Sequence, residues 1–337
     1  MFRLTAPGKS KLSPPPNKHI ALYLHGGWRC ASTYVWSRFR QSPHTLCFYE
    51  PFGEHLARCT RKRIRRDTAG GWNSRHPQLA RPYREEYLPL LRRLFKGVPG
   101  YREQFAYARY FPDKEGVGPE ARYLSRLLRL AIANGRQPVF GFSRSLARAA
   151  LLKRELGGYH VLVRRNPAQQ WLSCRSYRGQ LPLWYFELCH FLILALAPPD
   201  SPAGRFASAL RLPRLAPGLE RQFHELHAAI HPWSDELSYR AFTAVSLLSH
   251  AAAEPAADLA LDVDRLGRSQ QYRETVRARI LADVGLALRF EDCRVPTHDP
   301  ARVPLEYARI EREVRSALLS FGARLAPELA PARAVGA

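Results

Sequence analysis

Apolar residues in the first half of the chain follow two alternating patterns. Short continuous runs of four or five residues, bounded by glycine, proline or polar residues, have the length of buried strands. These runs cover residues 21–24, 45–49, 138–142 and 160–164, and a later one covers 259–263. Between them, stretches such as 83–95 and 121–133 place apolar side chains at helical spacing. This alternation predicts an α/β fold in which a parallel sheet is flanked by helices.

The second half of the chain is dominated by helical patterns. We expect helices over residues 184–196, 219–230, 238–253, 271–285 and 304–325. Because no internal repeat and no long polar linker separates the halves, a single domain is predicted over residues 19–325. It is flanked by a flexible, basic, proline-containing tail at 1–18 and by an Ala/Pro-rich tail at 326–337 that is expected to fray.

One stretch, residues 181–197, is apolar enough to raise the question of a membrane. It is shorter than the roughly 20 residues of a membrane span, and it contains Glu187 and His190. A buried helix is therefore the main expectation, and a peripheral membrane contact is the minor alternative. Residues 1–18 lack the apolar core of a signal peptide, so we expect a cytoplasmic protein without a transmembrane segment.

Composition changes this picture mainly through charge. The formal net charge at pH 7 is +23, and because seven of the 52 basic residues are lysines, 45 are arginines. Guanidinium groups pair well with phosphate and sulfate, so the charge favours anionic small molecules, nucleic acid or an anionic membrane as partners. The six cysteines form no C-x-x-C pair and have no histidines near them at zinc-finger spacing. No metal site is therefore predicted, and the thiols are expected to be reduced.

The candidate chemistry begins where the first predicted strand ends, within residues 21–36. The apolar run leads into the pair Gly26–Gly27 and then into a segment with helical spacing, which predicts a tight loop and a helix that begins near Ser32. Such a junction directs unpaired N–H groups and the positive end of the helix dipole at one point. Arg29 adds a full charge, and Ser32 and Thr33 add hydroxyl donors. The sequence therefore predicts an anion site here.

Features of three classes of protein are found in part in this sequence. A Walker A loop, as in nucleotide kinases, needs a second glycine and a lysine, and neither follows Gly27 at the right spacing. An α/β-hydrolase acting as an esterase would use Ser143 as the nucleophile, His25 and the glycine pair as the oxyanion loop, and Asp262 and His298 to complete a triad. The residue two positions after this serine is another serine, where such turns have glycine. A non-catalytic nucleic-acid binder, based on the net charge alone, is the remaining alternative.

Residues 28–33, Trp-Arg-Cys-Ala-Ser-Thr, resemble the phosphosulfate-binding loop of sulfotransferases. In that loop a basic residue, two small residues and a Ser/Thr pair follow the first strand. Ala31 stands where glycine is usual in the family. A second motif follows the fourth predicted strand, where Arg165 is followed by Asn-Pro and, eight residues after the arginine, by Ser173. This motif resembles the one with which sulfotransferases bind the 3′-phosphate of their donor.

Glu50 supplies a third point of resemblance, because it follows the second predicted strand and lies 21 residues after Arg29. In the carbohydrate and protein-tyrosine branches of the sulfotransferases, a glutamate at about this distance acts as the base. The resemblance covers about residues 20–177, with a fainter similarity over 259–295.

The resemblance implies a P-loop-NTPase-like sulfotransferase fold and transfer of a sulfuryl group from 3′-phosphoadenylyl sulfate, a co-substrate, to a hydroxyl or amine, without a metal. Glu50 would take the acceptor's proton and Arg29 would stabilise the transferred group. The donor would be bound by Arg29, Cys30, Ala31, Ser32 and Thr33, and its 3′-phosphate by Arg165 and Ser173. The acceptor would be a small molecule or a carbohydrate rather than nucleic acid. No motif in the sequence indicates which acceptor it is, or the oligomeric state.

Overall fold

Five parallel strands form the centre of the protein, whose computed structural model describes residues 20–67, 76–93, 95–113, 116–181, 184–230, 234–296, 298 and 306–325. The strands are β1 (Leu22–His25), β2 (Thr45–Tyr49), β3 (Gln137–Phe142), β4 (Tyr159–Arg164) and β5 (Leu259–Asp262). They lie in the order β2-β3-β1-β4-β5, and every neighbouring pair is parallel. The predicted α/β fold with a parallel sheet is confirmed, and each of the five apolar runs forms a strand. The predicted tails at 1–18 and 326–337 lie outside the described residues.

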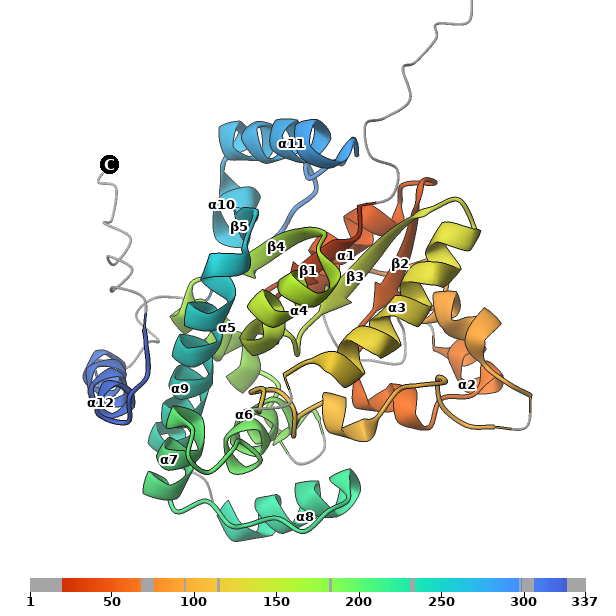
Figure 1. Ribbon diagram of the computed structural model, residues 1–337. Coiled ribbons are helices and arrows are strands. Elements are labelled where there is room, and N and C mark those ends of the chain that lie inside the picture. The colour runs from red at the N-terminus through yellow and green to blue at the C-terminus, as the bar shows by residue number, and fades with distance from the viewer. Residues whose placement is uncertain are drawn as a thin grey trace, which may run out of the picture.

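Helices cover both faces of the sheet (Figure 1). One face carries α1 (Ser32–Arg40), α10 (Val263–Arg268) and α11 (Gln270–Val284), and the other carries α3 (Gly118–Ala133) and α4 (Ala149–Leu156). Side chains of each strand alternate between the two layers. In β1, Leu22 and Leu24 belong to the apolar core shared with α1, whereas Tyr23 belongs to the core shared with α3. The short helix α2 (Arg61–Arg66) and the 3₁₀ helix η3 (Glu85–Leu90) follow β2.

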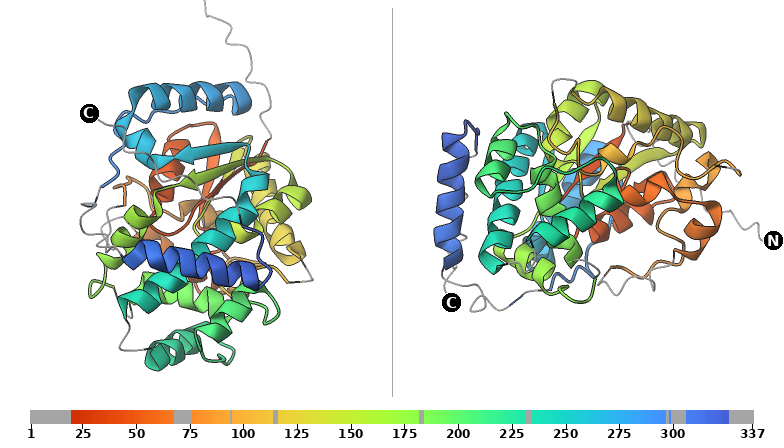
Figure 2. Two further views of the ribbon diagram at one scale, coloured as in Figure 1. Left: turned by 90° about the vertical axis from the view of Figure 1, so that its left-hand side faces the viewer. Right: turned by 90° about the horizontal axis from the view of Figure 1, so that it is seen from below.

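The second half of the chain adds a helical layer beside the sheet (Figure 2). After β4 come α5 (Pro167–Arg175), α6 (Tyr185–Ala195), α7 (Pro202–Ala209), α8 (Leu219–Ile230), α9 (Asp235–Ala253) and, at the end of the described chain, α12 (Glu306–Ser320). Helix α9 contacts both α6 and α12, and these helices share one apolar core. The predicted helical second half is confirmed.

Helix α6 lies inside this layer rather than on the surface. Every residue from Phe186 to Leu194 is buried, so the apolar stretch that raised the question of a membrane contact forms part of the core. Among the described helices, none has both the length and the apolar character needed to cross a bilayer.

The chain leaves the neighbouring strands β1 and β3 toward opposite faces of the sheet. After β1 it enters α1 on one face, and after β3 it continues into α4 on the other. Diverging connections leave a crevice between the carboxyl ends of two parallel strands, and ligands of open α/β sheets bind in such crevices. Arg29 follows β1, Ser143 follows β3, and Glu50 follows the adjacent strand β2. The topology therefore brings three of the candidate residues to one edge of the sheet.

All six cysteines are free and buried. Three lie in the core shared by the sheet, α1 and α11, two lie in the helical layer, and one lies in the core on the α3 side. Burial raises the pKa of each thiol, for example that of Cys189 to about 12 and that of Cys293 to about 11. The free thiols agree with the expectation from the sequence that they are reduced.

Gly141 of β3 lies against the ring of Trp36 from α1. A Cβ at this position would lie 2.6 Å from Cδ1 of Trp36, which is fully buried and has no room to retreat. We expect Gly141→Ala to lower the free energy of unfolding by about 1–3 kcal/mol, measured by urea denaturation. Gly118→Ala is the control, since its Cβ would meet only the end of the Arg122 side chain, at 3.6 Å. Equal losses of stability in the two variants would contradict this account of the packing.

Candidate functional site

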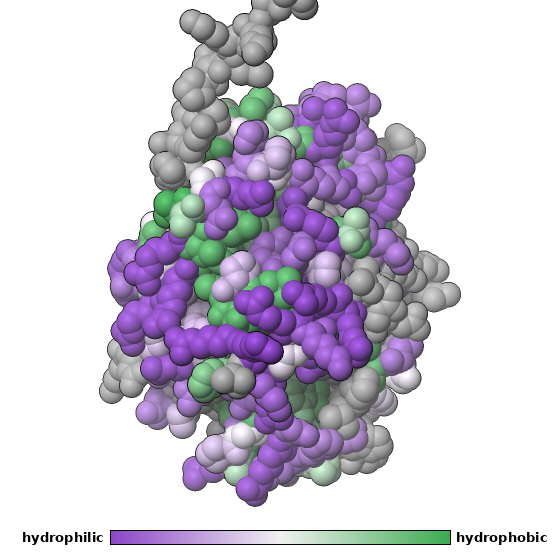
Figure 3. All heavy atoms as spheres, turned by 90° about the vertical axis from the view of Figure 1, so that its right-hand side faces the viewer, coloured by the Kyte–Doolittle hydropathy of each residue, from purple (hydrophilic) through white to green (hydrophobic). Residues whose placement is uncertain are grey.

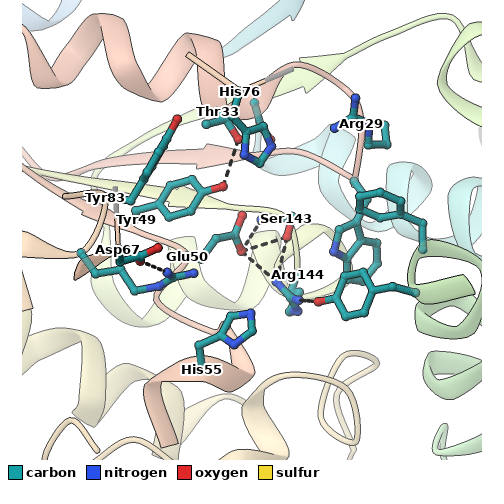
Figure 4. A pocket seen from close by; sticks show the side chains of 16 residues that line it. Arg29, Thr33, Tyr49, Glu50, His55, Asp67, His76, Tyr83, Ser143 and Arg144 are labelled. Carbon is teal, nitrogen blue, oxygen red and sulfur yellow. Dashed lines mark hydrogen bonds and ion pairs between the residues drawn. The ribbon is translucent and has the colours of Figure 1, made fainter. Parts of the chain in front are cut away.

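A cavity of about 750 Å³, open to solvent, lies at the carboxyl ends of β1, β2 and β3 (Figure 4). Its walls come from the β1–α1 loop, the ends of β2 and β3, the segment around residues 76–84 and the start of α6. Four of the eight site residues expected from the sequence line it, namely Arg29, Ser32, Thr33 and Glu50. The crevice predicted from the strand connections is therefore a real cavity, and it contains the anion loop together with the candidate base.

The β1–α1 loop turns sharply before the helix begins. Arg29 and Ala31 both have left-handed backbone conformations, with φ of 64° and 62°. Ala31 is the N-cap of α1, and the first bond within the helix runs from the N–H of Val35 to its carbonyl oxygen at 3.2 Å. The N–H groups of Ser32 and the two residues after it thus have no acceptor within the helix. No acidic residue lies in the first turn, so the positive end of this helix is not compensated by its own side chains.

The left-handed backbone conformation of Ala31 explains why glycine would be favoured at this position of the loop. Glycine adopts a φ near 60° without a steric penalty, whereas an L-alanine there costs about 1–2 kcal/mol. A tight loop of this shape therefore favours glycine at this position, and this chain forms the turn with alanine. The side chains of Ala31 and Cys30 belong to the apolar core on the α1 side. Within this loop, the predicted donor contacts of these two residues would have to come from their backbone.

The side chain of Arg29 joins the first predicted motif to the second. Its Nε donates to the hydroxyl of Ser173 at 3.1 Å, and its Nη2 donates to the hydroxyl of Tyr177 at 3.2 Å. Its guanidinium also lies over the Tyr177 ring, 4.3 Å from the ring centre. In the described chain Arg29 meets hydroxyls and rings but no carboxylate. Its full positive charge is therefore available to an anion in the cavity.

Arg165 lies behind the loop rather than in the wall of the cavity. Its Nη1 donates to the backbone carbonyl of Arg29 at 2.8 Å, and its Nη2 donates to the carbonyl of Pro296 at 2.5 Å. Its Nε lies 3.8 Å from a carboxylate oxygen of Asp264 and makes no hydrogen bond, although it is buried. The structure thus brings Arg165 and Ser173 next to Arg29, but in the described state Arg165 holds the loop and Ser173 accepts from Arg29.

Glu50 is held by one of its two carboxylate oxygens. Its Oε2 accepts from the N–H of Ser143 at 3.1 Å, from the hydroxyl of Ser143 at 2.8 Å and from Nη1 of Arg144 at 3.1 Å. Its Oε1 has no partner in the described chain (Figure 4). Burial raises the pKa of this carboxyl above the ordinary value, and Arg144 and the Ser143 bonds oppose that shift only in part. The arrangement presents one free oxygen of a buried carboxylate, which suits a group that accepts a proton.

Arg144 is shared between two carboxylates. Besides Glu50, its guanidinium pairs with Glu54 at 2.7 Å, donates to Tyr185 at 2.7 Å and lies over the ring of Trp28. Burial alone would raise the pKa of Glu54, but Arg144 and neighbouring groups hold it at about 2, so Glu54 stays ionised. Neither Arg144 nor Glu54 was predicted from the sequence as a site residue. A buried arginine beside Glu50 is recognisable only once the fold brings these residues together.

Two of the arginines in the cavity wall, Arg84 and Arg144, have their charge neutralised by nearby carboxylates. Arg84 forms an ion pair with an aspartate of the wall, and Arg144 pairs with two glutamates. Burial lowers the pKa of both His55 and His76 to about 4, so both are neutral near pH 7. The net positive charge of this wall therefore lies mainly at Arg29, beside the start of α1.

The residues named for the esterase alternative do not assemble into a triad. Ser143 donates to Glu50, whereas Asp262 caps α10 by accepting from the N–H of Arg265 at 3.0 Å. Strands β3 and β5 are three positions apart in the sheet, which separates their ends by roughly 14 Å. The buried ring of His25 instead forms hydrogen bonds with the hydroxyl of Ser145 at 2.7 Å and with the ring of His160 at 2.9 Å. This geometry gives the esterase alternative no support.

Comparison of the chain with family models, with characterised proteins and with solved structures found no match. The function of the chain is therefore inferred from its sequence motifs and from the geometry of this cavity.

Proposed function

We propose that the protein is a sulfotransferase, which transfers the sulfuryl group of 3′-phosphoadenylyl sulfate to a hydroxyl or amine acceptor. The observation that carries the proposal is that one cavity contains both the uncompensated anion loop at Arg29 and a buried carboxylate, Glu50, with one free oxygen. The finer description of the fold as P-loop-NTPase-like and sulfotransferase-like is part of the same proposal. It is supported by the central position of β1 and by the tight loop and helix that follow it.

The donor side of the reaction is assigned to the β1–α1 loop. Negative charge on the phosphosulfate, and on the phosphate that departs, is stabilised by cations and N–H donors that are already in place. Arg29 supplies the cation, Ser32 and Thr33 supply hydroxyls, and the first turn of α1 supplies N–H groups without helical acceptors. The hydroxyl of Thr33 also lies 3.1 Å from that of Tyr49, which fixes its position in the wall.

Glu50 is assigned the role of the base that takes the proton of the acceptor. As the acceptor oxygen forms its bond to sulfur, the bond between sulfur and the bridging oxygen of the donor breaks, and adenosine 3′,5′-bisphosphate leaves. The proton of the acceptor hydroxyl passes to Oε1 of Glu50, the oxygen without a partner in the described chain. Ser143 and Arg144 hold Oε2, so the carboxylate is oriented before the acceptor binds.

The 3′-phosphate of the donor is assigned to Arg165 and Ser173. Both lie beside Arg29, and the buried Nε of Arg165 lacks a hydrogen-bond partner, which a phosphate oxygen would supply. Binding would require Arg165 to exchange part of its carbonyl contacts for the phosphate. An arginine that already lies at the loop can do so without unfolding the strand that carries it.

Calorimetric titration with adenosine 3′,5′-bisphosphate, 5′-AMP and ATP tests this assignment. We expect the bisphosphate to bind at least tenfold more tightly than 5′-AMP, a difference of about 1.4 kcal/mol, and Arg165→Ala to remove that preference. Arg175→Ala is the matched control, since this arginine ends helix α5, which begins two residues after Arg165, and pairs with Asp235. No preference for the 3′-phosphate in the wild-type protein would overturn the proposal.

A further inference from the structure

Two segments of the chain meet to form a strongly basic surface at the edge of the molecule. Arg61, the first residue of α2, donates from Nε and Nη2 to the carbonyl of Leu91 at 3.2 and 3.0 Å. The N–H groups of Gly97 and Val98 bond back to the chain just before α2. Helix α2 and the described residues 92, 93, 95 and 96 therefore lie side by side. We call the exposed cations of these segments the α2 basic surface, and they are Arg61, Lys62, Arg63, Arg65, Arg66, Arg92, Arg93 and Lys96.

The α2 basic surface brings eight exposed cations together. In the helical layer several arginines pair with carboxylates, as Arg178 does with Glu187 and Arg240 with Glu236. None of the eight cations has a carboxylate within ion-pair distance in the described chain. Neither residues 55–66 nor residues 88–102 contain any Asp or Glu. The charge of this surface is therefore matched by no acidic side chain of its own segments.

An exposed aromatic side chain lies among the cations of the α2 basic surface. Phe95 is 65% exposed, more than the other large hydrophobic residues exposed in the described chain, Ile132, Leu281 and Leu319. It lies between Arg93 and Lys96 in the sequence. Figure 1 shows the segment after η3 at an outer corner of the molecule next to α2, and the space-filling view from that side shows a predominantly hydrophilic face (Figure 3).

We infer that the α2 basic surface, with Phe95, docks the protein on an anionic membrane. Lysine and arginine near such a membrane each contribute about 1 kcal/mol of attraction, and an aromatic side chain that enters the interface adds apolar burial. An outer corner touches a flat surface without needing a groove. Single-stranded nucleic acid, by contrast, binds in basic grooves lined with aromatic rings, and Phe95 is not part of the cavity wall. Charge, shape and the single exposed ring together favour the membrane.

The docking surface continues into the wall of the cavity. Asp67, the C-cap of α2, lines the cavity. A protein held by the α2 basic surface would have this part of the cavity wall near the lipid headgroups. The inference stands apart from the proposed reaction, because it rests on charge and exposure outside the cavity.

Co-sedimentation with phosphatidylcholine vesicles, with and without phosphatidylserine, tests the inference. We expect binding that requires phosphatidylserine and that falls at least tenfold in the double variant Arg65→Glu/Arg66→Glu. The double variant Arg289→Glu/Arg312→Glu changes the net charge equally at exposed positions elsewhere and is expected to bind as the wild type does. Equal losses in both double variants would show that net charge alone acts, and would overturn the inference.

Phe95→Ser separates a membrane from a soluble polyanion. We expect this variant to bind phosphatidylserine vesicles several-fold more weakly but to bind heparin and single-stranded RNA unchanged, because only the bilayer offers an apolar layer to the ring. Leu281→Ser is the control, since its side chain is 51% exposed and lies on α11. Absence of vesicle binding in the wild type, or an RNA affinity that depends on Phe95, would refute membrane docking. Circular dichroism establishes that each variant is folded.

Discussion

Replacement of Glu50 by glutamine is expected to lower the rate of sulfuryl transfer by about 10²–10⁴-fold while leaving the affinity for adenosine 3′,5′-bisphosphate unchanged. Glutamine keeps the shape of the side chain, and its amide oxygen can still accept from Ser143 and Arg144, but it cannot take a proton from the acceptor. The measurement is the release of the bisphosphate at saturating acceptor, together with calorimetric titration of the same variant. Loss of nucleotide binding along with activity would show that Glu50 supports the cavity rather than the chemistry.

The pH dependence of the wild-type rate provides a second readout of the same residue. A base must be deprotonated to act, so the rate should fall as the pH is lowered through the pKa of Glu50. Burial raises that pKa, so the fall should begin at a higher pH than for an ordinary glutamate. Asp67→Asn is the matched control, because Asp67 also lines the cavity but pairs with Arg84. This variant should retain the acid limb of the profile that Glu50→Gln loses.

Replacement of Glu120 by glutamine is expected to lower the free energy of unfolding by about 3–5 kcal/mol. Glu120 is fully buried in α3, and its Oε1 accepts from Arg109 at 2.9 Å and from Arg148 at 3.2 Å. Arg148 is also fully buried, and burial lowers its pKa to about 10 even with Glu120 beside it. Removing the negative charge would leave two guanidinium groups in the interior without their shared carboxylate.

Urea denaturation measures this effect, and an exposed ion pair provides the comparison. Glu313→Gln removes a carboxylate that pairs with Arg309 of α12 and with Arg240 of α9 at the surface, where water screens the charges. That variant is expected to lower the free energy of unfolding far less than Glu120→Gln does. If Glu120→Gln were equally mild, the buried cluster would have to relax or admit water in a way that the described packing does not show.

The strands of this protein could be predicted because both faces of its sheet are covered. A strand buried on both sides is continuously apolar, and residues 46–49 and 161–163 have this pattern. The order of the strands could not be predicted in the same way. It depends on the face to which each connection crosses, and the alternation of strand and helix does not contain that information.

Residues 83–95 show where the apolar spacing misled the prediction. The spacing fits an α-helix, but among the described residues 83–93 and 95 the only helix is the 3₁₀ helix η3, over Glu85–Leu90. Pro89 lies within it and has no N–H group with which to continue an α-helical ladder, so the chain leaves the helix at Leu91. The prediction of a helix over this whole range was wrong.

The residues of the candidate site could likewise be predicted from the sequence only in part. Arg29 and Glu50 were found because each follows a strand, and strand ends of a parallel sheet converge on one edge. Arg144 and Glu54 were missed because neither belongs to a recognised motif, and their importance comes from the contact between them and with Tyr185. Side chains that are far apart in sequence and become partners only after folding leave no local pattern.

The burial of all six thiols makes the protein convenient for site-specific labelling. Maleimides and similar reagents attack the thiolate, and each native cysteine combines a raised pKa with a position shielded from solvent. A cysteine introduced at an exposed position, such as Lys62 or Arg289, would therefore react far faster than the native ones. A fluorophore or spin label could be attached at one chosen point without first removing any cysteine from the core.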